Sequence, residues 1–520
     1  AYASSGITGL GDVAVTVSDS GSVAAADLNT LDTATSGAVA VSSVTTVTGT
    51  LSAANAAYAS SGITGLGNEA VTLSDSSVAA DDLNTLDSAT SSSINPASIT
   101  SISGTLSAVN TAYSSSGILG LTDEAITLTD TTIAAADLNT LDAKTTGSIN
   151  TTSVTTITGN ASSITSAYAS SGISALGDEA LTLSDTSISA SVLNTLDDNT
   201  SGTINAKTIT TISGTATAAR EAFDSDGISN LTFDAMSYIA SHNDLITAFG
   251  SDVTSAETHF FASGLTEGRS FNSFDAMNYI ASNSDLITAF GTNETAATTH
   301  YVTNGFNEGR SADSFNSWSY LASYSDLMNA FGENTTLAMS HYIEHGFEEG
   351  RSSDNFNEYN YLASNTELIG LYKDNLSGAT KHYVQYGHAS GRSTDSFDEF
   401  KYIASHVDLI NLFGLNSSSA TEHFVNHGFS EGRAVDSFDE YGYLASNDDL
   451  IAAFGLDTTA AVKHYITNGM LESRRTNTFN AVQYLDNYSD LRVAFGNDSD
   501  SAMTHYIQHG YAEGRTDAVI

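Results

Sequence analysis

Cysteine is absent from the 520 residues of this chain, and proline occurs only once. Without cysteine the chain has neither a disulfide scaffold nor a thiolate metal site. One proline beside 41 glycines fits neither collagen nor a proline-rich linker. The single tryptophan, Trp318, leaves the chain without the aromatic platform on which glycan-active enzymes usually bind a sugar.

Positive charge is also scarce, since 16 Lys and Arg residues face 60 Asp and Glu, for a net charge of −44. Such a field repels nucleic acid and attracts divalent cations, so we expect no nucleic-acid partner. No stretch approaches eighteen consecutive apolar residues, so we expect no membrane insertion. No signal-peptide pattern opens the chain, and its first eleven residues recur at 57–67, so we expect a processed or partial piece of a longer array.

What the sequence has in place of these features is repetition. The motif LNTLD begins at Leu28, Leu83, Leu138 and Leu193, which defines a 55-residue repeat. Each repeat alternates strand-like and helix-like segments too short to bury a face alone, so neighbours must stack. We therefore predict an α/β solenoid with a parallel sheet over residues 1–225. A pure β-helix is the alternative, because segments so rich in Ser and Thr are weak helix formers.

The residues of one 55-residue repeat illustrate this assignment. Residues 153–159 and 179–185 are rich in β-branched or alternating apolar residues and are predicted strands. Residues 160–172 and 187–202 carry apolar residues at helical spacing and each ends on a glycine. The repeat is thus expected to be two turns of roughly 27 residues, each made of a strand and a helix.

A second repeat, with a 41-residue period, occupies the rest of the chain, and we assign residues 226–520 to an all-α helical array. The repeat at 396–433 predicts three short helices. Ser396 and Glu399 suggest a capping box for the first. Gly414 and Gly428 are expected to end the second and third. Its period is set by seven histidines, His259, His300, His341, His382, His423, His464 and His505.

These histidines invite a metal-site interpretation, but no HExxH motif occurs, and a His-x3-His pair occurs in only three of the seven repeats. We therefore predict a structural histidine at a helix–helix contact, with a surface transition-metal site as the alternative.

Seven of the ten arginines also keep the 41-residue register. A planar guanidinium suits bidentate bonding to a carboxylate, and an acid recurs in the same register. We predict a repeating internal clamp between the arginines Arg269, Arg310, Arg351, Arg392, Arg433, Arg474 and Arg515 and the acids Asp244, Asp285, Asp326, Glu367, Asp408, Asp449 and Asp490. A ligand-binding row of arginines is the alternative.

Carboxylates at turns of the first array are candidate calcium ligands, because calcium prefers hard oxygen donors. The alternative is a solvated acidic surface, and neither an EF-hand loop nor the glycine-rich calcium-binding nonapeptide is present. Calcium is the one cofactor that the sequence suggests. The candidate ligands are Asp123, Glu124, Asp130, Asp178, Glu179 and Asp185.

Motifs of catalysis are lacking. The sequence contains no P-loop, no GxSxG, no Rossmann glycine motif after a strand and no kinase motif set. We therefore expect that the chain is not an enzyme, with a glycan-active enzyme ranked far below the structural alternatives.

The repeats themselves resemble known sequences. The 55-residue unit, with LNTLD and AYxSSGIxxLGDEAxTLSD, resembles repeats in very large secreted proteins of marine bacteria and cyanobacteria. The 41-residue unit, with YIASxxDLIxAFG and HYxxxGxxEGR, resembles repeats in bacterial surface and hemolysin-type calcium-binding proteins. The resemblance covers nearly the whole chain and carries over no catalytic residue. It implies export by a type I route, with which the terminal RTDAVI is compatible.

Together these features predict a structural, self-assembling, calcium-stabilised surface protein, namely an S-layer or filament subunit that is secreted to the cell surface. Its expected partners are further copies of itself and a cell-surface glycan. The alternative is an adhesin stalk or phage-type fibre that holds a binding tip located elsewhere.

Overall fold

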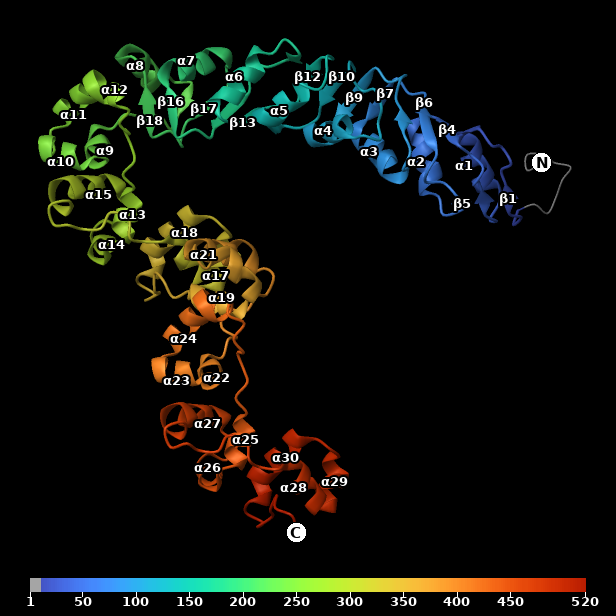
Figure 1. The fold of residues 1–520 in the computed structure, drawn as a ribbon. Helices are drawn as coiled ribbons and strands as arrows, with labels where there is room; N and C mark the ends of the chain where they lie inside the picture. The colour runs from blue at the N-terminus through green and yellow to red at the C-terminus, as the bar shows by residue number, and fades with distance from the viewer. Residues whose placement is uncertain (1–10) are drawn as a thin grey trace. The chain divides into compact units, whose positions relative to one another are not determined.

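A computed structural model describes residues 11–520, which divide into two compact units (Figure 1). The first comprises residues 11–274 with Thr298–Arg310, and the second comprises Asp275–Ala297 with Ser311–Ile520. Repeated β-α units with parallel sheets form the N-terminal part of the chain, and a helical array follows from Ala235.

The β-α part contains short strands and eight helices within residues 11–229. The strands are β1 (Val15–Thr16), β2 (Ser22–Ala24), β3 (Val39–Ala40), β4 (Thr46–Gly49), β5 (Ile63–Thr64), β6 (Ala70–Leu73), β7 (Ser77–Ala79), β8 (Ile94–Asn95), β9 (Ser101–Gly104), β10 (Ala125–Leu128), β11 (Thr132–Ala134), β12 (Ile149–Asn150), β13 (Thr156–Gly159), β14 (Ile173–Ser174), β15 (Ala180–Leu183), β16 (Ser187–Ser189), β17 (Ile204–Asn205), β18 (Thr211–Ser213) and β19 (Ile228–Ser229). The helices are α1 (Ala25–Ala34), α2 (Leu51–Ala59), α3 (Ala80–Ala89), α4 (Leu106–Ser114), α5 (Ala135–Asp142), α6 (Ala161–Ala169), α7 (Ala190–Asn199) and α8 (Ala216–Asp224).

The strands pair in parallel with strands about one turn later in the chain. Thr156 of β13, for example, pairs with Thr132 of β11 on one side and Ala180 of β15 on the other, an equal step in each direction along the chain. The five-stranded sheets have the orders β7-β9-β10-β12-β14 and β11-β13-β15-β17-β19. Each of these sheets spans nearly two 55-residue repeats, and the second begins before the first has ended, so successive repeats share their sheets.

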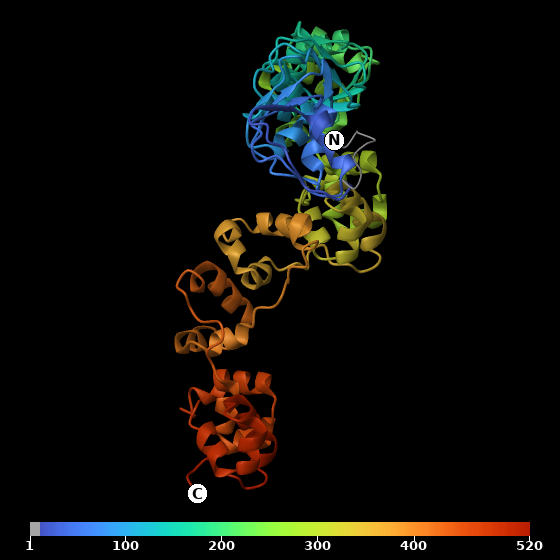
Figure 2. The same ribbon diagram turned by 90° about the vertical axis from the view of Figure 1, so that its right-hand side faces the viewer.

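Consecutive helices of the β-α units pack against one another from α1 to α8 and form a row beside the strands. Figure 2 looks along this row, so that successive units overlap in projection. The first leucine of each LNTLD motif is fully buried, as are Val47, Ile157 and Ile204 on the strands. The repeated apolar residues therefore form one continuous core, and burial of each leucine contributes about 2 kcal/mol.

The prediction of β-α units is confirmed, and the alternative of a pure β-helix is wrong, because each repeat has two helices. The number of strands differs from the expectation, however. Most 55-residue repeats contain five strands rather than two, since two-residue segments such as Ile173–Ser174 also pair. Strands this short carry no visible alternation in the sequence. Likewise, the predicted helix at 187–202 begins as strand β16 and becomes helical only at Ala190.

The helical array consists of seven repeats of three short helices, each followed by a π-helical turn. The first four repeats contain α9 (Ala235–Ala240), α10 (Asn243–Phe249), α11 (Val253–His259), η1 (Phe260–Gly264) and α12 (Leu265–Glu267); α13 (Ala276–Ala281), α14 (Ser284–Phe290), α15 (Glu294–His300) and η2 (Tyr301–Gly305); α16 (Ser317–Ala322), α17 (Ser325–Phe331), α18 (Thr335–His341) and η3 (Tyr342–Gly346); and α19 (Glu358–Ser364), η4 (Thr366–Leu368), α20 (Ile369–Tyr372), α21 (Leu376–His382) and η5 (Tyr383–Gly387). The last three contain α22 (Glu399–Ala404), α23 (Val407–Phe413), α24 (Ser417–His423) and η6 (Phe424–Gly428); α25 (Glu440–Ala445), α26 (Asp448–Phe454), α27 (Thr458–His464) and η7 (Tyr465–Gly469); and α28 (Ala481–Asn487), α29 (Ser489–Phe495), α30 (Ser499–His505) and η8 (Tyr506–Gly510).

The helix ends of the fifth repeat differ in part from the sequence-based expectation. Asp398, rather than Ser396, caps α22, because its side chain accepts a hydrogen bond from the backbone N–H of Lys401. Gly414 follows the end of α23 with a positive φ of 53°, as expected for a helix-ending glycine. Gly428 instead ends the π-helical turn, and the left-handed conformation comes later, at Gly432 with a φ of 67°.

Adjacent helical repeats of the second unit are joined by side-chain to backbone hydrogen bonds. The hydroxyl of Ser405 accepts from the backbone N–H of Ser437, 2.8 Å away, in the next repeat. One residue later in the chain, the ring of His406 lies 2.8 Å from the carbonyl oxygen of Ala434. In the sixth repeat Ser446 and Asn447 make the same two kinds of contact.

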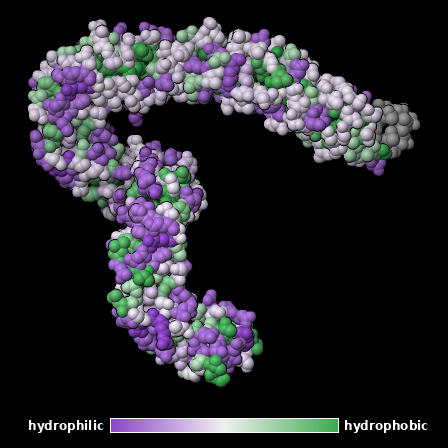
Figure 3. Space-filling view, in the orientation of Figure 1, coloured by the Kyte–Doolittle hydropathy of each residue, from purple (hydrophilic) through white to green (hydrophobic). Residues whose placement is uncertain are grey.

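The surface is mostly polar. Figure 3 shows apolar residues scattered among hydrophilic ones on the face in view. Large apolar side chains that are exposed include Leu371, Leu412, Leu471 and Val493. Within residues 11–520 no helix has both the length and the apolar character needed to cross a membrane.

Candidate functional site

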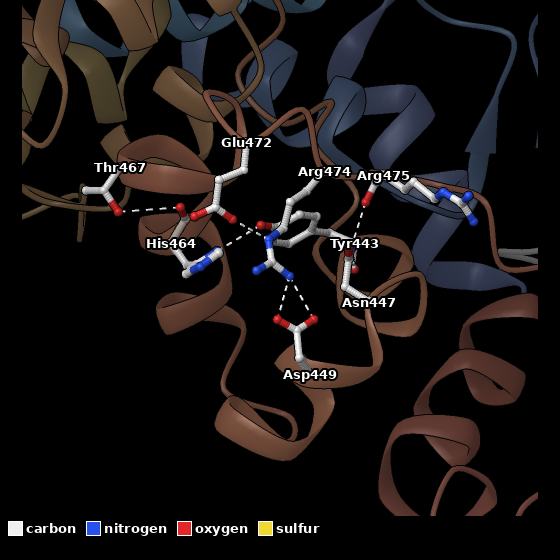
Figure 4. Close-up of polar contacts among 8 residues, drawn as sticks. All are labelled: Tyr443, Asn447, Asp449, His464, Thr467, Glu472, Arg474 and Arg475. Atoms are coloured by element: carbon white, nitrogen blue, oxygen red, sulfur yellow. Dashed lines mark hydrogen bonds and ion pairs between the residues drawn. The ribbon is translucent and has the colours of Figure 1, made fainter.

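The residues that look most chemical in the sequence form one cluster per helical repeat, shown in Figure 4 for the sixth repeat. Tyr443 comes from α25, and its hydroxyl lies 2.8 Å from Nδ1 of His464 at the end of α27. Arg474 extends toward Asp449, in the first turn of α26, and its Nη1 lies 2.7 Å from both carboxylate oxygens. The cluster thus ties all three helices of the repeat together.

The tyrosine of each cluster belongs to the core. All seven tyrosines, from Tyr238 to Tyr484, are fully buried. A buried hydroxyl requires a hydrogen-bond partner, and the histidine at the end of the third helix of the repeat provides it. The Tyr Oη to His Nδ1 distances lie between 2.8 and 3.0 Å for Tyr238–His259, Tyr320–His341, Tyr361–His382, Tyr402–His423, Tyr443–His464 and Tyr484–His505.

In the fifth repeat, both members of the pair, Tyr402 and His423, are uncharged at neutral pH. Burial raises the pKa of Tyr402 to about 12. Burial, and then the nearby Arg433, lowers the pKa of His423 below its usual value. The bond is therefore a neutral hydrogen bond between a phenol and an imidazole, and it fixes the ring orientation of the histidine.

A glycine makes room for the tyrosine hydroxyl. A Cβ atom on Gly428 would lie only 2.1 Å from Oη of Tyr402. The equivalent distance at Gly510 is 2.0 Å, from Oη of Tyr484. The glycine of the HG or NG dipeptide is therefore required by close packing rather than by its backbone conformation.

The structure brings the repeated arginines and acids together as ion pairs. Distances of 2.7 to 2.9 Å join the pairs Arg269–Asp244, Arg351–Asp326, Arg433–Asp408, Arg474–Asp449 and Arg515–Asp490. Arg392 pairs with Glu367 in the same way. In the second repeat Asp285 takes the equivalent position in the first turn of α14, and Arg310 pairs with Glu308.

Sequence reasoning missed a second acid in this cluster, the glutamate two residues before the arginine. Its carboxylate lies 2.5 to 2.6 Å from the arginine Nε in six repeats, for example between Glu472 and Arg474. The signal was the repeated tripeptide, which is EGR in five of these repeats and ESR at 472–474. In the fourth repeat Ser390 occupies that place, and Arg392 bonds to Asn365 and Glu367 instead.

These ion pairs lie at the surface. The Arg474 side chain is 23% exposed and that of Asp449 is 62% exposed. Exposed pairs contribute only about 0–1 kcal/mol each, so their effect is to fix the turn that follows each π-helical segment. The hydrogen bond from Arg474 lowers the pKa of Asp449, which keeps this carboxylate ionised to lower pH.

The candidate calcium ligands have different surroundings from one another. Glu124 and Glu179 are buried, and each accepts a hydrogen bond from a tyrosine hydroxyl, at 2.8 and 3.0 Å. The carboxylates of Asp130 and Asp185 each accept from the first backbone N–H of a helix, that of α4 or α6, at 2.7 Å. The remaining two, Asp123 and Asp178, are exposed. Across residues 11–520 no group of three or more His, Cys, Asp or Glu side chains is arranged to hold a metal ion.

The buried glutamate–tyrosine pair is a repeated feature that sequence reasoning missed. Glu69 and Tyr58 form it in an earlier repeat, with a separation of 3.3 Å. Burial and then the charge of Glu69 raise the pKa of Tyr58 to about 12. At the last equivalent position, after Tyr113 and Tyr168, the aromatic residue is Phe223, which has no hydroxyl and packs with Phe233 and Phe271. The tyrosine was visible as a periodic aromatic, but its acidic partners Glu124 and Glu179 were predicted to be calcium ligands at turns.

No protein-family model, curated protein or solved structure matches this chain. The repeat architecture and these recurring clusters therefore define its class, which is that of a repeat protein.

Proposed function

We propose that this chain is a structural, self-assembling protein of the cell surface, either an S-layer or an extracellular filament subunit. One observation carries the proposal. The side chains that look catalytic recur in repeat after repeat, and their polar atoms bond within the chain. Sites that recur in this way suit a scaffold, in which each contact is one of many equal joints.

The first array, residues 1–225, is proposed to be a solenoid. Parallel pairing of Ile157 with Ile133 of the preceding turn and with Leu181 of the following turn supports this, because each turn of chain then stacks on the one before it. The continuous packing of α1 to α8 supports it further.

Assembly between copies is proposed to be heterologous, so that one surface of a copy meets a different surface of the next and a lattice or filament grows. The net charge of −44 opposes such contacts. Calcium is proposed to bind exposed carboxylates where copies meet, since Glu124, Glu179, Asp130 and Asp185 already bond to donors of their own chain.

A cell-surface glycan is the second proposed partner, in keeping with secretion to the cell surface. A groove of about 880 Å³ beside α4 and α5 supports this. Its wall carries several Ser and Thr hydroxyls together with Asp87, Asp137 and Lys144, which can exchange hydrogen bonds with sugar hydroxyls.

The deciding experiment is electron microscopy of the purified chain in calcium and in excess chelator, with magnesium at equal ionic strength as the control. Sheets or filaments that form in calcium and dissolve in chelator are the expected result. Assembly that ignores the chelator would retain the lattice and remove calcium from the mechanism. Isolated particles in every condition would contradict the lattice proposal and favour a stalk or fibre spacer.

A further inference from the structure

Three of the seven helical repeats carry a second histidine four residues after the periodic one. These residues are His345, His427 and His509, and they occur in the third, fifth and seventh repeats. The ring centres of His341 and His345 are 5.6 Å apart, those of His423 and His427 are 5.6 Å apart, and those of His505 and His509 are 5.5 Å apart. The same geometry therefore appears three times in one chain.

The first histidine of each pair is already oriented. Nδ1 of His341 lies 3.0 Å from the hydroxyl of buried Tyr320, which leaves Nε2 as the other nitrogen able to bind a ligand. Metal-binding histidines usually have this arrangement, in which one ring nitrogen bonds to the protein and the other to the ion.

The second histidine of each pair is exposed to solvent. His345 lies on η3, and within residues 11–520 its ring makes no hydrogen bond or ion pair. His427 on η6 and His509 on η8 are exposed in the same way. In the sixth repeat Asn468 occupies this position, and the Tyr443–His464 bond is nevertheless present at 2.8 Å.

The spacing of the rings fits a shared ion. A zinc–nitrogen bond of about 2.0–2.1 Å places the ion roughly 3.2 Å from each ring centre, and a tetrahedral angle then separates the centres by about 5.2 Å. The separations of 5.5 to 5.6 Å in the structure are close to this value.

The charges nearby also permit a cation. Arg351 is the positive residue next to His341, and it is paired with two carboxylates, those of Asp326 and Glu349. The one positive and two negative charges beside His341 sum to a net negative charge, which attracts a divalent cation.

We propose that each pair, His341–His345, His423–His427 and His505–His509, binds one divalent transition-metal ion of the class that prefers imidazole, such as Zn²⁺, Ni²⁺ or Cu²⁺. Nε2 of the first histidine and one ring nitrogen of the second supply two ligands, and water fills the remaining positions. Nδ1–H of the first histidine then donates to the tyrosine hydroxyl. Two protein ligands make an open surface site rather than a closed structural one.

The test is calorimetric titration of the full chain with zinc chloride in a large excess of magnesium, which saturates the general binding of cations by carboxylates. The matched variant carries His345→Asn, His427→Asn and His509→Asn, the residue that the sixth repeat itself uses. We expect about three zinc ions per chain for the native protein and loss of these sites in the triple variant. Each single substitution should remove about one third of the bound zinc.

A second measurement keeps folding separate from binding. The triple variant should retain the native circular dichroism spectrum, because Asn468 is compatible with the same repeat structure. Nuclear magnetic resonance of the native chain should show zinc-induced shifts confined to the imidazole rings of the three pairs. Equal zinc titrations for the native chain and the folded triple variant would overturn the proposal, as would shifts that are equally large at His464.

Discussion

Replacement of Gly428 by alanine tests the packing of the tyrosine–histidine pair most directly. The added Cβ would lie 2.1 Å from Oη of Tyr402 and 3.1 Å from its Cζ. Tyr402 is fully buried, and its hydroxyl lies 2.9 Å from Nδ1 of His423, so the ring cannot move away without breaking that bond. The methyl group and the hydrogen bond therefore compete for the same space.

The expected loss of stability follows from three contributions. An unpaired buried hydroxyl and imidazole cost about 1–3 kcal/mol. Overpacking adds about 1–3 kcal/mol, and the better helix propensity of alanine returns up to about 1 kcal/mol. We expect a net destabilisation of about 3 kcal/mol, localised to the fifth helical repeat.

Native-state hydrogen exchange measures this local free energy, because unfolding of one repeat need not be global. Amides of α22 and α24 should exchange roughly 100-fold faster in Gly428→Ala. The matched control is the same substitution in a Tyr402→Phe background, where the clashing oxygen is absent. There the change should lie within about 1 kcal/mol of zero, since only the contacts with Cζ of residue 402 and with Cδ2 of Phe424, 3.3 Å away, remain.

The sign of the change in unfolding free energy distinguishes a glycine required by packing from an ordinary helix residue. If Gly428 were only a helix residue, alanine would stabilise the repeat by up to about 1 kcal/mol. Stabilisation in the native background, or an equal loss in both backgrounds, would show that the tyrosine hydroxyl does not dictate this glycine.

Three further predictions concern other parts of the chain. Tyr168→Phe should cost about 1–3 kcal/mol in thermal or denaturant unfolding, because buried Glu179 loses a hydrogen-bond donor; an unchanged midpoint would contradict this. Arg433→Gln should cost at most about 1 kcal/mol, since its partner Asp408 is 62% exposed, and a loss well above this would mean that the ion pair is more than a surface clamp. The free energy of unfolding of the helical array should fall as the pH drops below about 6.5. The pKa values of His341, His382, His423 and His505 are lowered in the folded array, so the unfolded chain binds protons at a higher pH than the folded chain does. The hydrogen bond from Arg433 lowers the pKa of Asp408, so this ion pair adds a further loss only below about pH 4. Hydrogen exchange at pH 7 and pH 5.5 checks the first loss, which should spare residues 11–229, where there is no histidine.

Periodicity made much of this fold predictable. A buried leucine or tyrosine that recurs at a constant interval reveals the repeat length, and its neighbours reveal whether the segment is a helix or a longer strand. Two-residue strands such as β14 could not be predicted, because their stability comes from partners in the preceding turn, such as Ile149 for Ile173, rather than from their own sequence. The sharing of one sheet by two repeats is invisible for the same reason.

The sites were predictable to a similar degree. The register of Arg433 and Asp408 showed that the two belonged together, because long-range partners in a repeat protein keep a constant separation. The burial of Glu179 was not predictable, since an acidic residue beside glycine and aspartate reads as a solvated turn. Only the folded chain places the Tyr168 hydroxyl beside its carboxylate.

The staggered sheets have a mechanical consequence. The five sheets span residues 15–64, 22–95, 77–174, 132–229 and 187–213, so every point of the chain between Val15 and Ser229 lies within the span of at least one sheet. A pull on this part must open strand pairing wherever it yields. Neighbouring helical repeats share no sheet and are joined by packing between short helices, such as α22 with α27, and by hydrogen bonds such as that from Ser437 to Ser405. Under tension the helical repeats should extend one at a time and act as the compliant part of the chain, while the β-α units carry the load without lengthening.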